Sequence, residues 1–117
     1  MLYITTNHKM KTFELDDTTT CVLGETAKEN WSIIDDSKGD FIWMHLNSFP
    51  SGHIIIQSDE INNDILVKAG NLCRQNTKYR DVPNLKVCYT KVSNLIKGEK
   101  PGSVHYKSNR QVKTLKL

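Results

Sequence analysis

The most hydrophobic stretch of the chain consists of two short apolar runs joined by a polar loop. The first run, residues 41–46, has apolar side chains at both odd and even positions, and the second, residues 53–57, contains three consecutive isoleucines. Aromatic and β-branched residues favour strands, and strands that are apolar on both faces are typical of the interior of a sheet. The loop between the runs carries Pro50, Ser51 and Gly52, which are turn-forming residues. The pattern therefore predicts a buried β-hairpin at the centre of the fold.

Apolar residues at helical spacing predict two helices. Ala27, Trp31 and Ile34 recur at i, i+4 and i+7 behind a Thr-x-x-Glu capping box at residues 26–29. A second, longer helix is expected over residues 59–77, because the acidic residues at its start complement the helix dipole. The stripe that this second helix is expected to bury consists of Ile61, Ile65, Ala69, Leu72 and Cys73.

Shorter apolar segments predict the remaining strands, which are residues 2–5, 11–15, 21–23, 85–91, 104–106 and 112–117. In the fourth of these, Leu85, Val87 and Tyr89 alternate with more polar residues, which indicates one buried and one solvated face. Residues 97–102, K-G-E-K-P-G, form the strongest loop signal. The elements together predict a single α+β domain over residues 1–117, with an antiparallel or mixed β-sheet and two α-helices packed on it.

Composition sets limits on the class of protein. A chain of 117 residues is long enough for one hydrophobic core, and no apolar stretch approaches the roughly 18 residues that a membrane helix needs. The first residues lack the basic start and apolar core of a signal peptide, and the three cysteines are widely spaced with no C-x-x-C pair. We therefore expect a cytoplasmic protein without disulfides, metal or other cofactor.

Charge is unevenly distributed along the chain. Residues 1–59 carry four lysines against nine carboxylates, a net charge of −5, whereas residues 60–117 carry twelve basic residues against four carboxylates, a net charge of +8. A basic half is typical of proteins that bind polyanions such as nucleic acids. A lysine-rich solvated surface would give the same pattern, so charge alone leaves both interpretations open.

The two histidines of the central hairpin are candidates for chemistry. His45 and His53 together could serve as general acid and base in a small nuclease or phosphodiesterase. If Leu46 pairs with His53, the two imidazoles lie on opposite faces of the sheet, whereas a shift of one residue brings them together. The only carboxylates near them in sequence are Asp40 and Asp59. Three roles stay open: a main-chain hydrogen bond inside the sheet, contact with a phosphate or base edge, and catalysis. The first two are favoured over the third.

Basic residues gather at two further places. Lys97 and Lys100 belong to the Gly-containing loop, which lacks the G-x-x-x-x-G-K-[ST] pattern of a P-loop but can still reach a nucleic-acid backbone. Arg74, Lys78 and Arg80 crowd the end of the second helix, where cations also favour the helix dipole. The tyrosines that lie among basic residues, as in proteins that stack single-stranded bases, are Tyr79 and Tyr106.

The order of several motifs is more specific than any one of them. Residues 42–45 (I-W-M-H) and 50–56 (P-S-G-H-I-I-I) resemble the W-F-H and P-G-S-H-V-V-I signature of the NFACT RNA-binding domain family. Residues 22–30 resemble its V-G-R-N-A-x-x-N segment, residues 87–95 its V-x-Y-T-x-V-x-x-V strand, and residues 97–104 its K-G-x-K-P-G-x-V loop. The resemblance runs in register from residue 22 to the end of the chain.

This resemblance implies a domain that binds RNA without catalysing a reaction. In the large members of the family the domain is one module of a ribosome-quality-control factor, which engages the large ribosomal subunit and tRNA. The chain looks more like the small stand-alone type, here without its coiled-coil tail. The implied partners are RNA (tRNA or rRNA, with DNA also open) and the large ribosomal subunit, with no membrane. The residues expected to contact nucleic acid are His45, Ser51, Gly52, His53, Arg74, Lys78, Arg80, Lys97 and Lys100.

Two alternatives to an RNA-binding module stay open. One is the small nuclease or phosphodiesterase that uses His45 and His53. The other is a protein-interaction module that docks on a ribosomal partner. The sequence leaves open which RNA is bound and what the oligomeric state is.

Overall fold

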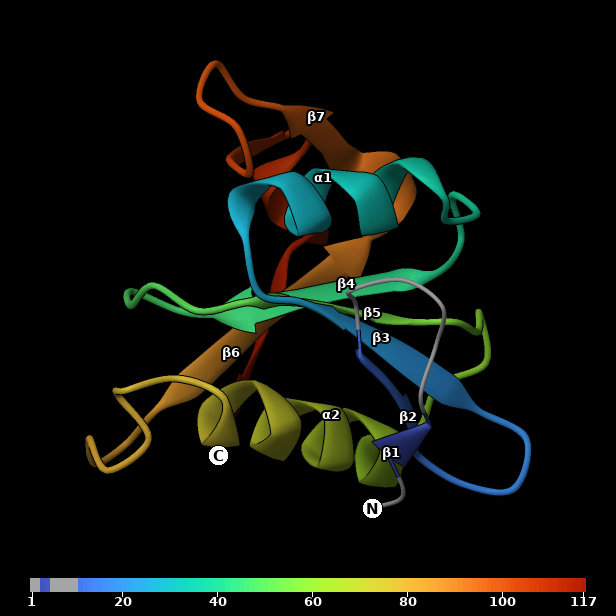
Figure 1. Ribbon diagram of the computed structural model, residues 1–117, viewed down its shortest axis with the longest axis vertical. Coiled ribbons are helices and arrows are strands. Elements are labelled where there is room, and N and C mark those ends of the chain that lie inside the picture. The colour runs from blue at the N-terminus through green and yellow to red at the C-terminus, as the bar shows by residue number, and fades with distance from the viewer. Residues whose placement is uncertain (1–2, 5–10) are drawn as a thin grey trace.

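The computed structural model describes residues 3–4 and 11–117, with side chains from residue 11 onwards. A β-sheet forms the middle layer, helix α1 (Ala27–Asp35) covers one face, and helix α2 (Asn63–Gln75) covers the other, as Figure 1 shows. A small second sheet, made by β7 (Leu95–Lys97) and β8 (Val104–Tyr106), lies on the α1 side. This arrangement confirms the α+β class.

In the part of the chain that the structure describes, the main sheet has seven strands in the order β1-β2-β3-β5-β4-β6-β9, and every neighbouring pair is antiparallel. The predicted central hairpin is confirmed, because β4 and β5 occupy interior positions. The strand bounds are β1 Tyr3–Ile4, β2 Lys11–Glu14, β3 Thr20–Gly24, β4 Ile42–Leu46, β5 His53–Ile56, β6 Lys86–Lys91 and β9 Lys113–Lys116. Within the described residues the sheet is therefore purely antiparallel, the first of the two forms expected.

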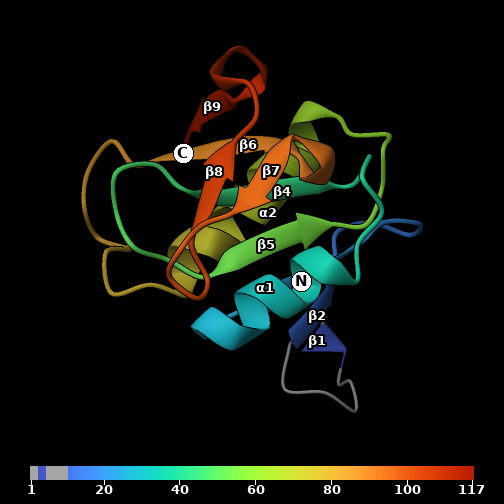
Figure 2. The ribbon, with the colours of Figure 1, turned by 90° about the horizontal axis from the view of Figure 1, so that it is seen from above.

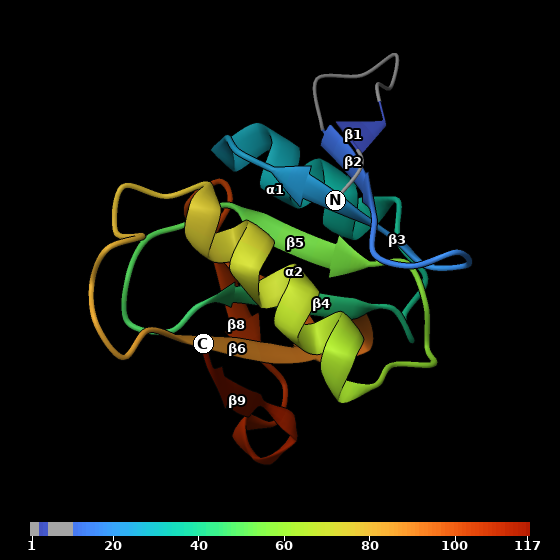
Figure 3. The ribbon, with the colours of Figure 1, turned by 90° about the horizontal axis from the view of Figure 1, so that it is seen from below.

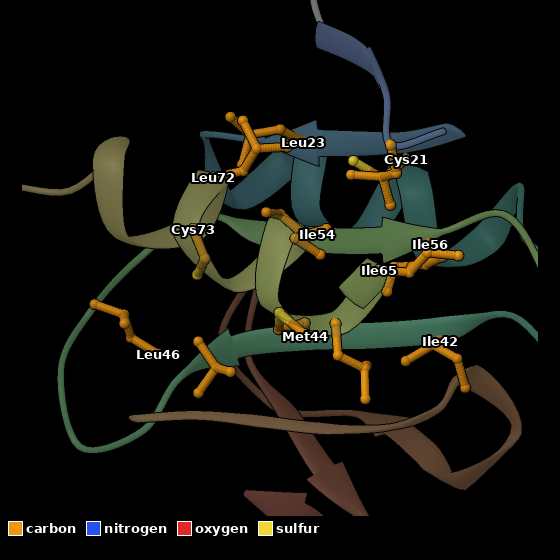
Figure 4. Packing of buried hydrophobic residues seen from close by; sticks show 14 of the residues in the cluster. Cys21, Leu23, Ile42, Met44, Leu46, Ile54, Ile56, Ile65, Leu72 and Cys73 are labelled. Atoms are coloured by element: carbon orange, nitrogen blue, oxygen red, sulfur yellow. The ribbon is translucent and has the colours of Figure 1, made fainter. Parts of the chain in front are cut away.

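The α2 face holds the larger hydrophobic core. Side chains of α2 such as Ile65 and Leu72 pack onto Met44 of β4 and Ile54 of β5 (Figures 3 and 4). The helix begins later than expected, because Asn62 caps it: the Asn62 side chain accepts a hydrogen bond from the Ile65 amide at 2.9 Å. The expected buried stripe is confirmed except for its first member, Ile61, which precedes the helix and is only half-buried.

Helix α1 lies across the other face (Figure 2). Its capping box is confirmed in part: the Glu29 amide donates to Thr26 Oγ1 at 3.1 Å, but the Glu29 carboxylate accepts from the amide of Glu25 instead of that of Thr26. The expected apolar stripe is corrected, since Ala27 is exposed and Ile33 is the buried aliphatic residue. A short helix with few apolar residues leaves its rotation to tertiary packing.

The expectation of a solvated face on strand β6 is wrong. Cys88 and Thr90 lie on that face, and they are only 6% and 4% exposed. The 3₁₀ helices η1 (Val92–Asn94) and η2 (Asn109–Gln111) cover them, because Thr90 Oγ1 donates to the Gln111 carbonyl at 3.1 Å and accepts from Asn94 Nδ2 at 3.0 Å. Polar residues therefore fill this face because the segments that follow β6 supply hydrogen-bond partners.

The part of the chain that the structure describes contains no helix with the length and apolar character needed to span a membrane. The first predicted strand, residues 2–5, is described only at Tyr3–Ile4, where it forms β1. The residues that connect the first two predicted strands lie outside the described part of the chain.

Candidate nucleic-acid interface

The two histidines of the hairpin lie on the same face of the sheet. The register pairs Trp43 with Ile55 and Met44 with Ile54, and its continuation places His45 opposite His53. The two imidazole rings meet edge to face, with centroids 5.2 Å apart and planes at 84°. The structure thus settles the register that the sequence left open, and both rings face the α1 side.

Two aromatic side chains join the histidines. The Trp43 ring lies parallel to the His45 ring, with centroids 5.8 Å apart and an angle of 4° between the ring planes. Trp43 also meets His53 edge to face, with ring centroids 5.2 Å apart. Tyr106 of strand β8 contacts Trp43 with centroids 5.9 Å apart. The Tyr106 hydroxyl lies 3.6 Å from Cys88 Sγ. An aromatic cluster from three strands therefore forms one continuous surface, and we call it the aromatic pocket.

The aromatic pocket encloses about 270 Å³ and is lined by Trp43, His45, His53, Gly102, Ser103, Val104 and Tyr106. Two of its nitrogen atoms, Trp43 Nε1 and His53 Nδ1, are buried and have no hydrogen-bond partner within the described part of the chain. Their residues are 1% and 5% exposed. A buried polar atom without a partner costs roughly 1–3 kcal/mol. Both nitrogens belong to residues that line the aromatic pocket, so a ligand that hydrogen-bonded to them would remove this cost.

Burial keeps the histidines neutral near pH 7. Burial, together with the neighbouring His45, lowers the pKa of His53 to about 3. Burial also lowers the pKa of His45, although the hydrogen bond from His45 Nδ1 to the Leu46 carbonyl, 2.6 Å long, opposes that shift. Because a carbonyl only accepts, Nδ1 of His45 carries the proton and Nε2 is an acceptor. The aromatic pocket therefore offers neutral donors and acceptors.

The loop between β7 and β8 forms the rim of the aromatic pocket and is held on α1. The Trp31 indole of α1 donates to the Ser103 carbonyl at 2.9 Å. Gly102 has a φ of +84°, and a Cβ there would lie 2.8 Å from the Cα of Ala27. The backbone of Gly102 can approach α1 this closely only because glycine has no side chain.

The two lysines expected to contact RNA in this hairpin have different surroundings. Lys97 Nζ lies 2.6 Å from the Asp35 carboxylate and 5.3 Å from the centre of the Trp31 ring, so it ties the hairpin to α1. Lys100 is exposed in the loop and forms no ion pair with any described residue. Of these two lysines, Lys100 is the one whose charge no described carboxylate compensates.

The loop of the central hairpin has a packing role. Ser51 Oγ accepts a hydrogen bond from the Leu46 amide at 3.0 Å and lies 3.4 Å from Cys73 Sγ of α2. At Gly52 a Cβ would lie 2.4 Å from the Gly24 carbonyl oxygen of β3. Ser51 and Gly52 thus shape the turn that carries His53, and their direct contact with nucleic acid stays a prediction.

The structure separates the basic cluster at the end of α2 from the aromatic pocket. Arg74 is in the last turn of α2, and Lys78 and Arg80 follow in the next turn, whereas α2 covers the opposite face of the sheet (Figures 1 and 3). Lys78 Nζ lies 5.3 Å from the Tyr79 ring centre, and Arg80 donates to the Thr77 carbonyl. The expected binding residues therefore fall on two faces of the molecule.

Sequence reasoning missed three residues that build the aromatic pocket. Trp43 forms its floor, Trp31 holds its rim, and the buried Asn30 of α1 accepts from the His53 amide at 3.2 Å. The alternation of Trp43 with His45 on one face of a strand was the available signal. For Asn30 the signal was its position at the end of the segment of residues 22–30 that resembles the family motif, and Trp31 follows directly after it. Helix rotation decides which of these side chains reach the sheet.

A metal site finds no support in the side chains present. Among the described residues, no three His, Cys, Asp or Glu side chains lie close enough to hold a metal ion. The cysteines Cys21, Cys73 and Cys88 are free and buried. Fold and site together define a small α+β domain with an aromatic pocket under a basic hairpin.

The chain belongs to the family of NFACT protein RNA-binding domains, whose model matches residues 9–108. The chain is also 28% identical over 109 residues to Rqc2 homolog RqcH of Bacillus subtilis (strain 168). The matched region covers 91% of this chain and 19% of that protein. It thus spans about a fifth of the length of this curated relative. At the level of the family, the match supports RNA binding.

A solved structure has the same fold. The C-terminal part of the fibronectin/fibrinogen-binding protein from Streptococcus suis (FBPS) superposes with a TM-score of 0.84 over 97% of this chain and 47% of that chain. At 23% sequence identity, this likeness shows the fold alone.

Proposed function

We propose that the chain is a non-catalytic module that binds single-stranded RNA and takes one base into the aromatic pocket. The observation that carries the proposal is the pair of buried, unpartnered nitrogens, Trp43 Nε1 and His53 Nδ1, in a pocket lined by rings. Proteins that read single-stranded RNA stack bases on aromatic or histidine rings and hydrogen-bond to the base edges.

The size of the aromatic pocket supports a base as its occupant. Its volume of about 270 Å³ corresponds to roughly nine waters at ~30 Å³ each, more than one structural water needs. It falls below the roughly 300–1,000 Å³ of pockets that enclose a whole small ligand. A base edge can accept from the Trp43 indole N–H, and His53 Nδ1 can accept or donate according to its tautomer.

The rim supplies a contact for the RNA backbone. Lys100 is the rim cation whose charge no described carboxylate compensates, and it lies in the loop that reaches over the pocket. Lys97 positions this loop through Asp35. A phosphate next to the bound base would lie against Lys100, which adds a salt-dependent, sequence-independent part to the affinity.

A non-catalytic role agrees with the electrostatics of the histidines. General acid catalysis near pH 7 needs a group that is protonated there, and burial lowers the pKa of both His45 and His53. No described carboxylate makes a hydrogen bond to either ring. The same two rings suit binding, because neutral imidazoles stack on bases and exchange hydrogen bonds with them.

The cellular role follows the family. We propose tRNA or rRNA as the ligand and the large ribosomal subunit as the place of action, in the cytoplasm. The contacts expected for Ser51, Gly52 and the α2-end cluster (Arg74, Lys78 and Arg80) belong to this proposal as well. Single-stranded DNA is the competitor to test, since only RNA carries the 2′-hydroxyl.

The test measures fluorescence anisotropy of a labelled single-stranded RNA dodecamer. His45→Ala and His53→Leu are expected to weaken binding roughly fivefold to a hundredfold, the range of one lost base contact. His105→Ala is the matched control, because His105 is an exposed histidine of β8 that does not line the pocket. Circular dichroism establishes that each variant is folded.

A second measurement separates the pocket from general polyanion binding. An RNA series with one abasic position is titrated onto wild type and onto His45→Ala. We expect the RNA affinity of wild type to fall when the abasic site replaces the base that enters the aromatic pocket. His45→Ala is expected to bind all RNAs of the series with equal affinity. Equal affinity of His45→Ala, His53→Leu and His105→Ala would remove the pocket from the proposal, and a wild type that binds no RNA at low salt would overturn the function itself.

A further inference from the structure

A second hollow, larger than the aromatic pocket, lies beside the edge strand β9. It encloses about 540 Å³ and is bounded by the start of β4, the segment before α2, the end of β6, η2 and β9. We call it the cationic groove, and its lining residues are Ile42, Asp59, Ile61, Tyr89, Thr90, Lys91, Arg110, Gln111 and Lys113.

Three cations from three different elements line the cationic groove. Lys91 ends β6, Arg110 lies in η2, and Lys113 begins β9. All three are exposed, and within the described chain none of their side chains forms an ion pair or hydrogen bond. Asp59 is the single carboxylate among the lining residues, so the lining carries a formal charge of +2.

Protection of the sheet edge explains only part of this arrangement. Lysines on an edge strand discourage pairing with other chains, which accounts for Lys113 and Lys116 on β9. It does not account for Arg110, which lies outside the sheet, or for Lys91, which lies on β6, the strand next to the edge strand β9. Side chains alternate along a strand, so Lys116 faces away from the side that Lys113 occupies. Lys116 is therefore not part of the groove.

The chemistry of the lining identifies the ligand. A hollow with three unpaired cations, the amide of Gln111 and the hydroxyl of Tyr89 offers charged and neutral donors to a tetrahedral oxyanion. We propose that the cationic groove is a phosphate-binding site. The assignment of RNA as the source of this phosphate rests on the proposed function: the occupant is then a backbone phosphate of the RNA whose base lies in the aromatic pocket. A free phosphate monoester has the same chemistry and is the other source to test.

The first experiment uses inorganic phosphate, so it does not depend on RNA binding. Backbone amide resonances of residues 89–91 and 110–113 are followed by NMR during a phosphate titration at constant ionic strength. We expect saturable shifts confined to these residues in wild type and in Lys116→Ala, and loss of the shifts in the double variant Lys91→Ala, Arg110→Ala. The positions substituted here and in the second experiment are all exposed (Lys91, Arg110, Lys113 and Lys116), so we expect each variant to keep its fold.

The second experiment identifies the source of the phosphate through the salt dependence of RNA affinity. Arg110→Ala and Lys113→Ala are expected to weaken binding roughly fivefold at low salt, the weight of one ion contact in water. Each is also expected to reduce the slope of log K against log salt by about 0.7. Lys116→Ala, with the same charge change on the opposite face of β9, should match wild type.

The outcomes are distinct. Chemical-shift changes on phosphate addition, together with a reduced slope of log K against log salt in the variants, support the cationic groove with the RNA backbone as its ligand. The same chemical-shift changes with an unchanged slope support the groove with a free phosphate monoester as its ligand. The absence of both effects overturns the groove, while RNA binding that depends on His45 would leave the proposed function standing. If wild type binds no RNA, the proposed function fails and the phosphate titration alone decides on the groove.

Discussion

His45 and His53 meet edge to face across strands β4 and β5, with ring centroids 5.2 Å apart. The register of one strand pair creates this contact, and burial then keeps both rings neutral by lowering the pKa of each. A pair of neutral histidines over a tryptophan is a surface for binding a flat, hydrogen-bonding ligand.

Stability should decrease as the pH is lowered below about 6.5, because of His53. Its pKa is about 3 in the folded state and about 6.5 in an unfolded chain, so between these values the unfolded state binds one more proton. The free energy of unfolding then rises with pH in this window, by up to about 1.4 kcal/mol per pH unit for one proton. This contribution is complete above pH 6.5 and is lost as the pH falls toward 3.

Urea unfolding of wild type and His53→Gln from pH 7.5 to pH 4 checks this prediction. Glutamine does not titrate, so the variant should show a shallower loss of stability, and the difference between the two slopes isolates His53 from the carboxylates. Parallel slopes for the two proteins would contradict a neutral, buried His53.

RNA should remain intact in the presence of the protein. Burial lowers the pKa of both histidines and so reduces the protonated fraction that a general acid needs near pH 7. Incubation of a labelled RNA with a molar excess of wild type, followed by gel electrophoresis, is expected to show no cleavage products above those of His45→Ala. Cleavage that disappears in His45→Ala would establish the nuclease alternative.

Gly102→Ala should displace the rim of the aromatic pocket. An alanine at φ +84° costs roughly 1–2 kcal/mol, and its Cβ would lie 2.8 Å from the main chain of α1 at Ala27. We expect chemical-shift changes over residues 98–104 and at least fivefold weaker RNA binding, the effect of one lost ion contact at the rim. Pro101→Ala is the control, because it changes the same loop at an exposed position without a positive φ. Wild-type affinity in Gly102→Ala would show that the rim does not contact RNA.

Gly52→Ala should destabilise the fold itself. A Cβ at this position would lie 2.4 Å from the Gly24 carbonyl oxygen, so β3 and the start of β5 must separate. We expect the free energy of unfolding to fall by about 2 kcal/mol or more, as for other overpacked sites. The control is Gly39→Ala, whose nearest contact is a side-chain carbon of Ser93 at 3.2 Å and which should lose less. Equal losses in chemical denaturation would contradict a special role for Gly52.

Local sequence patterns predicted most of the elements correctly. The central hairpin, the α2 stripe from Ile65 to Cys73, and the capping hydroxyl of Thr26 follow from hydrophobic period and cap chemistry, which act over a few residues. The start of α2 was placed too early because Asn62, not the acidic pair before it, makes the cap. The rotation of α1 was wrong because a short helix takes its orientation from the sheet below it.

The sequence alone determined the α+β class, the pairing of the central strands into a hairpin, and the resemblance that the family match then confirmed. Only the tertiary structure decided that His45 and His53 share a face, that Trp43 and Tyr106 join them, and that the α2-end cations lie on the opposite face. The physical reason is that strand register, helix rotation and the docking of the β7–β8 hairpin depend on contacts between segments far apart in the chain. Hydrophobic period specifies which face of an element is buried, but not which distant side chains it meets there.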